Sequence, residues 1–150
     1  MRLIIQRVKQ ASVSIENNIH GAIDQGLMVL VGIENEDNEE DINWLTNKLI
    51  GLRIFSDSEG KMNLSIKEIG GNILVVSQFT LFASTVKGNR PSFIKSAKPD
   101  IAVPLYEKFV EQLQKQSGLD IQTGKFGADM QISLINDGPV TIFIDSKNRE

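Results

Sequence analysis

The chain has 150 residues, 41% of them hydrophobic and 23% charged, and its formal net charge is −3. These values predict a single globular domain over residues 1–150, large enough to bury a hydrophobic core. The sequence has no cysteine and no long apolar run, which excludes disulfides, thiol chemistry and a membrane-spanning segment.

The first half of the chain is predicted to hold four strands and one helix. A loose alternation predicts a strand at 2–8, and residues 11–16 and 19–24 have the pattern of a hairpin. Residues 27–33 form a continuous apolar run, which is typical of a buried central strand. A helix is predicted over 39–51, because acidic residues at its start suit the helix dipole. Its apolar residues recur at helical spacing: Ile42, Leu45 and Leu49.

The second half is predicted to hold three strands and one helix. Residues 72–82 start with an apolar run that favours a central strand and then become polar. Residues 83–98 form a long loop, and loops of that length in compact domains are usually functional. A helix is predicted over 100–117, followed by strands at 128–135 and 140–145.

Strands in blocks separated by two helices indicate an α+β fold. We expect a largely antiparallel, curved sheet or small barrel with two main helices packed on one side. The polar end of the chain, residues 146–150, is expected to be disordered. The first residues lack the pattern of a signal peptide, so a cytoplasmic location is the default expectation.

The charge is distributed unevenly along the chain. Acidic residues crowd 34–41, whereas 69–99 contains no acidic residue at all. Basic residues fall within this second segment: Lys87, Arg90, Lys95 and Lys98. Phosphate binding responds to such a local positive field more than to the net charge. The alternative is an ordinary solvated basic loop.

Two stretches stand out as candidate functional motifs. Asn136-Asp137-Gly138-Pro139 separates two β-branched runs, and its proline cannot donate to a β ladder. Gly138 has no side chain, so the backbone can approach another molecule closely. The alternative is an ordinary turn. The second stretch, 77–82, follows a strong strand and carries the hydroxyls of Ser77 and Thr80.

Several kinds of catalytic site are excluded by the residue types. With no cysteine and only His20, the chain cannot build a structural zinc site or a three-histidine site, and we expect no metal or cofactor. A Ser-His-Asp triad would have to use His20, and nothing near it supports that role. Thr80 is a candidate nucleophile, but an unassisted threonine hydroxyl is a poor one and no base is evident.

The two stretches together resemble the signature motifs of the D-aminoacyl-tRNA deacylases, at 77–81 and 136–141. Further segments agree with the family in the same order, so the resemblance covers about residues 1–145. They are Ile5-Gln6-Arg7-Val8, Arg53-Ile54-Phe55-Ser56-Asp57, Gly60-Lys61-Met62-Asn63-Leu64, Arg90-Pro91-Ser92-Phe93 and Gln122-Thr123-Gly124-Lys125-Phe126.

The resemblance implies a hydrolase for the ester bond of D-aminoacyl-tRNA, with glycyl-tRNA as a further substrate. It implies that the 2′-hydroxyl of the terminal adenosine assists the attacking water. The catalytic residues would be Ser77, Gln78, Phe79 and Thr80. Backbone N–H groups around Gln78, Phe79 and Thr80 would face the developing oxyanion, and Phe79 would help to seat the adenosine.

The resemblance also implies how L-aminoacyl esters are rejected. A cis Gly138-Pro139 pair would reach from one subunit of a homodimer into the other subunit's pocket, where its carbonyl oxygens exclude an L side chain. Arg7 would hold the orientation of this pair. Further expected substrate or tRNA contacts are Lys87, Arg90, Met130, Asn136, Val140 and Thr141. A core position is the alternative for Met130.

The expected partners are therefore D-aminoacyl-tRNA and a second copy of the chain, with no membrane and no DNA. The expected role is chiral proofreading in translation. Two other functions remain open from the residues alone. One is a conventional Thr or Ser esterase that uses Thr80. The other is a non-catalytic RNA-binding protein that uses the basic loop.

Overall fold

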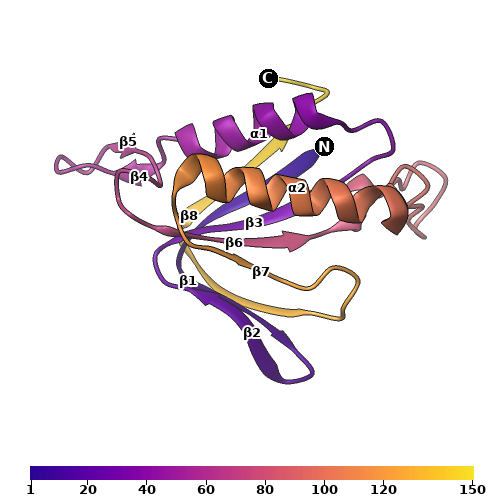
Figure 1. Cartoon of the computed structure of the whole chain (residues 1–150), viewed down its shortest axis with the longest axis horizontal. Helices are drawn as coiled ribbons and strands as arrows, with labels where there is room; N and C mark the ends of the chain where they lie inside the picture. The colour runs from indigo at the N-terminus through magenta and orange to yellow at the C-terminus, as the bar shows by residue number, and fades with distance from the viewer.

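The computed structural model describes all 150 residues and has a strongly curved, mixed sheet with two helices on one side (Figure 1). The sheet has the strand order β2-β1-β3-β6-β7, and β8 pairs with β1. In chain order the elements are β1 (Arg2–Ile15), β2 (Asn18–Ile23), β3 (Gly26–Gly32), α1 (Glu39–Gly51), β4 (Phe55–Ser56), β5 (Met62–Leu64), β6 (Asn72–Ser77), the 3₁₀ turn η1 (Phe79–Phe82), α2 (Pro99–Ser117), β7 (Ile121–Thr123) and β8 (Gln131–Asp145).

The curvature follows from the length of β1, which pairs with three strands. Its first half pairs with β3, its second half pairs with β2, and β8 runs antiparallel along its whole length. The two ends of the sheet come close together, since a Cβ at Gly21 of β2 would lie 3.1 Å from the Thr123 carbonyl oxygen of β7. The expected α+β fold with a largely antiparallel, curved sheet is confirmed. Two strand pairs, β3–β6 and β6–β7, are parallel.

The two helices cover one face of the sheet and enclose the main core (Figure 1). Asn38 caps α1 through a capping box, which confirms the predicted start of that helix. Pro99 begins α2, and Gly118 ends it in the left-handed conformation at φ 67°. The core side chains of α2 include Tyr106, whose hydroxyl donates to the Val75 carbonyl of β6 at 2.9 Å. Burial raises the pKa of Tyr106.

Several predicted element boundaries were wrong. The strands expected at 2–8 and 11–16 form one strand, β1, and those expected at 128–135 and 140–145 belong to one strand, β8. Residues 121–123, where no strand was expected, form β7. The strand expected over 72–82 ends at Ser77. It ends there because η1 folds over β3, where a Cβ at Gly32 would lie only 2.8 Å from the Leu81 Cβ. The bare backbone of Gly32 therefore allows the turn that carries the first motif.

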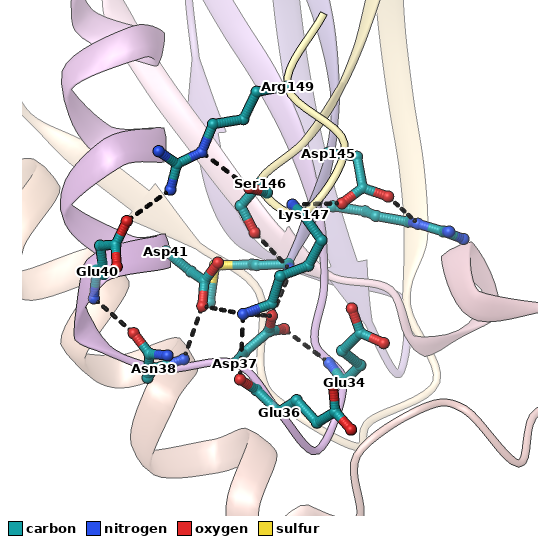
Figure 2. Close-up of polar contacts among 12 residues, drawn as sticks. Glu34, Glu36, Asp37, Asn38, Glu40, Asp41, Asp145, Ser146, Lys147 and Arg149 are labelled. Carbon is teal, nitrogen blue, oxygen red and sulfur yellow. Dashed lines mark hydrogen bonds and ion pairs between the residues drawn. The ribbon is translucent and has the colours of Figure 1, made fainter.

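The tail at 146–150, predicted to be disordered, instead packs against the start of α1 (Figure 2). The Ser146 Oγ lies 2.8 Å from the α-amino nitrogen of Met1, which also pairs with Asp37. Lys147 Nζ lies 2.8 Å from Asp41 Oδ2. Arg149 pairs with Glu40 at 3.0 Å. The prediction failed because the acidic segment, far away in sequence, supplies the partners for these cations.

This arrangement predicts a loss of stability in acid. Burial alone would raise the pKa of Asp41, but hydrogen bonds from Lys147, Ser146 and Asn38 outweigh it and hold that pKa below its ordinary value. The stabilisation is therefore present at neutral pH and is lost as the pH falls below about 4. We expect Asp41→Asn to lower the free energy of unfolding by about 2 kcal/mol at pH 7.

Urea unfolding of both proteins between pH 7 and pH 2 measures this effect. The difference between wild type and Asp41→Asn should shrink as the carboxylate becomes protonated. Glu111 is exposed and forms no ion pair, so Glu111→Gln is the control. A difference for Asp41→Asn that stays constant across this range would contradict the prediction.

Candidate active site

A pocket of about 570 Å³ opens where β6 ends and η1 begins. Its walls come from four parts of the chain: the end of β6 with the start of η1, the end of the 83–98 loop with the first residue of α2, the segment before β8, and the start of β8 itself. The lining residues are Val76, Ser77, Gln78, Phe79, Phe93, Ser96, Ala97, Pro99, Phe126, Gly127, Ala128, Met130 and Ile132. None of these side chains is ionisable. The pocket therefore provides aromatic and apolar surface together with a few neutral polar groups.

Two aromatic rings form one wall of the pocket. Phe79 of η1 and Phe93 of the loop meet edge to face, with ring centroids 5.0 Å apart. Phe79 is 55% exposed, so most of its ring is available to a ligand. Aromatic faces of this kind stack nucleobases in many RNA-binding proteins.

Met130 forms another part of the wall because Gly124 makes room for it. A Cβ at Gly124 would lie 2.5 Å from the Met130 sulfur, so a larger residue at 124 would force the Met130 side chain out of its present position. Met130 also packs against buried residues of the smaller core cluster. The two roles considered for Met130, pocket wall and core, are therefore combined in one side chain.

The backbone N–H groups near the pocket differ in their availability. The Gln78 N–H donates to the Val31 carbonyl at 2.7 Å and is already used. Phe79 and Thr80 begin η1, and the first N–H groups of a helical turn have no partner within that turn. The side-chain amide of Gln78 donates to Thr80 Oγ1 at 2.6 Å. The Thr80 hydroxyl is therefore held by a neutral amide, with no base in contact to activate it.

The second motif lies in an outward bulge of β8 opposite Arg7. Gln6 pairs with Thr141 and Val8 pairs with Asn136, so the single residue Arg7 faces the four residues 137–140. The Gly138-Pro139 peptide bond is cis, and both residues are exposed.

Side chains hold this bulge from both sides. The Arg7 Nε donates to the Asp137 carbonyl at 3.1 Å, and its Nη1 donates to the Ile54 carbonyl at 2.6 Å. The Asn136 side chain accepts a bond from the Val140 N–H at 3.2 Å and donates to Thr141 Oγ1 at 3.0 Å. Arg7 therefore fixes the carbonyl just before Gly138.

Comparison with known proteins agrees with the two motifs. The sequence matches the family described as D-Tyr-tRNA(Tyr) deacylase over residues 4–145. A D-aminoacyl-tRNA deacylase from Flavobacterium psychrophilum is 63% identical over 150 residues, and the match covers both chains completely. A protein of the same name from Bacteroides fragilis is 59% identical, again over the whole of both chains. The chain belongs to this family.

Solved structures show the family fold as well. One titled c-Myc DNA Unwinding Element Binding Protein superposes with a TM-score of 0.91 and 40% identity, covering 97% of this chain and 98% of that one. A probable eukaryotic D-amino acid tRNA deacylase superposes with a TM-score of 0.80 and 20% identity, covering 95% and 97%. The second likeness shows the shared fold alone.

The structure divides the predicted site residues of this family member between two places. Ser77, Gln78, Phe79 and Met130 line the pocket, and Thr80 follows directly in η1. A second group lies at the β8 bulge, and none of its members lines the pocket of the same chain: Arg7, Asn136, Gly138, Pro139, Val140 and Thr141.

Lys87 and Arg90 are exposed residues of the 83–98 loop, do not line the pocket and form no ion pair. No cluster of three or more His, Cys, Asp or Glu side chains is placed to hold a metal ion. Neither helix is long and apolar enough to cross a membrane.

Sequence reasoning identified four of the 13 lining residues, and those it missed include Phe93, Ser96 and Phe126. Phe93 and Phe126 belong to segments that carry the family resemblance, which was the available signal. Ser96 had no such signal, because its contact with η1 is visible only in three dimensions.

Proposed function

We propose that this protein hydrolyses the ester bond of D-aminoacyl-tRNA and releases the free D-amino acid and tRNA. The observation that carries the proposal is a pocket of about 570 Å³ with aromatic walls and no ionisable side chain, beside the first N–H groups of η1, in a member of this family. The names of its full-length relatives support the same substrate class.

In the proposed reaction the terminal adenosine packs against Phe79, and a water molecule attacks the ester carbonyl carbon. The N–H groups of Phe79 and Thr80 stabilise the oxyanion that forms, and one such donor is worth about 2.7–4 kcal/mol. The 2′-hydroxyl of the same adenosine assists the attacking water. The bond between the carbonyl carbon and the 3′ oxygen then breaks, and the 3′ oxygen regains a proton.

The proposed selectivity comes from a second copy of the chain. The exposed Gly138-Pro139 pair of one subunit enters the pocket region of its partner and occupies the space that an L side chain requires. Arg7 donates to the adjacent Asp137 carbonyl and so sets the direction of this segment. Hydrogen bonds of the Asn136 side chain with Val140 and Thr141 hold the two ends of the segment together. Glycyl esters have no side chain to exclude, so glycyl-tRNA is accepted too.

The exposed cations of the 83–98 loop suit the phosphate backbone of the tRNA. Lys87 and Arg90 are unpaired and lie on the loop that also supplies Phe93 and Ser96 to the pocket. The 3′ end of a tRNA that enters the pocket would therefore pass this loop and its cations. A tRNA substrate places the activity in the cytoplasm.

The proposal is tested by incubating the protein with D-tyrosyl-tRNA and L-tyrosyl-tRNA and measuring the free amino acid released. Release from the D form only is expected. Equal rates, or no release from the D form, would contradict the proposal. Binding of tRNA without any cleavage at high enzyme concentration would indicate a non-catalytic RNA-binding protein instead.

The Thr80→Ala variant in the same assay separates this proposal from a conventional threonine esterase. An esterase with Thr80 as nucleophile would lose nearly all activity. The proposed reaction uses the Thr80 N–H and not its hydroxyl, so the variant should keep kcat within about tenfold of wild type. This limit allows for the lost bond between Gln78 and Thr80, since one hydrogen bond contributes about 0.5–1.5 kcal/mol.

A further inference from the structure

Ser96 lines the pocket and its hydroxyl reaches the backbone of η1. The Ser96 Oγ donates to the Phe79 carbonyl oxygen at 2.6 Å. This carbonyl belongs to the same peptide unit as the N–H of Thr80. The unit is planar and trans, so a hydrogen bond that fixes the direction of the oxygen also fixes the opposite direction of the N–H.

The same bond also changes the strength of the N–H as a donor. Hydrogen bonds in a chain polarise one another, by about 10–30% per bond in condensed-phase estimates. The Phe79 carbonyl already accepts a bond from Ser96, so the Thr80 N–H of the same peptide unit is a better donor. This N–H also needs less reorganisation when negative charge develops on the substrate oxygen.

We propose that Ser96 is a positioning residue that orients and polarises the Phe79–Thr80 peptide for stabilisation of the oxyanion. This inference rests on the proposed ester hydrolysis. It assigns to the loop a part in the chemical step, in addition to its place in the pocket wall.

The hydroxyl of Ser96 can be removed without freeing the loop, because the backbone is held independently. The Ala97 N–H donates to the Ile33 carbonyl at 2.9 Å, and the Ser96 N–H donates to the Phe93 carbonyl at 3.0 Å. The contact between the rings of Phe93 and Phe79 also remains. A loss of activity in Ser96→Ala therefore reports the hydroxyl and not the fold of the loop.

The test compares kcat and KM of wild type, Ser96→Ala and Ser96→Thr with D-tyrosyl-tRNA. Ser96→Ala should lower kcat about fivefold, the factor that corresponds to a net hydrogen-bond contribution near 1 kcal/mol. Its KM should stay within about twofold, because the Phe79 ring keeps its place. Ser96→Thr retains a hydroxyl and should keep most of kcat.

Ser92→Ala is the matched control, because Ser92 lies on the same loop and is exposed, and its backbone alone pairs with Ser84. It should leave both constants unchanged. Wild-type kcat in Ser96→Ala, or a raised KM with kcat unchanged, would overturn the inference while ester hydrolysis stands. An equal loss of kcat in Ser96→Thr would also overturn it. If the wild type releases no D-tyrosine, the proposed function fails and this inference fails with it.

Discussion

Gly138→Ala is expected to lower the discrimination between D-tyrosyl-tRNA and L-tyrosyl-tRNA by about 100-fold. The quantity measured is the ratio of kcat/KM for the two esters. The proposed selection by exclusion would depend on the position of the backbone carbonyls to within about 1 Å, and a misplacement of that size can cost a factor of about 100.

Gly138 tolerates no side chain in its present position. Its φ is +125°, a conformation that L residues rarely adopt, and an added Cβ would lie 2.9 Å from both Arg7 Nη2 and Val140 Cγ2. The Arg7 guanidinium cannot simply move away, because it also donates to the Ile54 carbonyl. The bulge itself would therefore have to shift and take its carbonyl oxygens with it.

Gly60→Ala is the matched control. Gly60 also has a positive φ, +78°, but an added Cβ there would meet nothing within 4 Å. Gly60→Ala should lower the free energy of unfolding slightly and leave the ratio of kcat/KM for the two esters unchanged. If Gly138→Ala keeps the ratio of kcat/KM for the two esters within about threefold of wild type, the bulge does not determine the selectivity.

The fold was predictable from sequence where the signal was local. Continuous apolar runs located the central strands, and the acidic start and the spacing of Ile42, Leu45 and Leu49 located the first helix at 39–51, where the structure has α1. The long β1, the bulge opposite Arg7 and the position of the tail were not predictable in this way. Each depends on register or on charge pairing between distant segments, and neither leaves a periodic signal in the sequence.

The candidate site shows the same division. The stretch 77–80 and the Gly138-Pro139 pair were identified from sequence, because unusual residues stand at the ends of strong strands. Ser96, by contrast, is one of several serines in the 83–98 loop, and it reaches η1 only because the chain folds back and the Ala97 N–H pairs with the Ile33 carbonyl. A pocket assembled from four parts of the chain requires their packing to be known.

Removing the 2′-hydroxyl from the terminal adenosine of the substrate should lower kcat by about 100-fold or more. The reason is that no side chain of the pocket can act as a general acid or base. No lining side chain is ionisable, and the Thr80 hydroxyl contacts a neutral amide. General acid–base assistance raises a reaction rate by about 10²–10⁴. In the proposed reaction the 2′-hydroxyl of the substrate supplies this assistance.

The measurement uses D-tyrosyl-tRNA that ends in 2′-deoxyadenosine, with the ester on the 3′ oxygen, beside the ordinary substrate. The 2′-hydroxyl also affects spontaneous hydrolysis, so each catalysed rate is divided by the spontaneous rate of the same ester. KM should change only a few-fold, because the adenine ring and the Phe79 contact are unaltered. A corrected kcat within about fivefold of the ordinary substrate would mean that the protein supplies the base. Such a base would have to come from outside the residues that line the pocket, and the proposed second subunit would be the place to look for it.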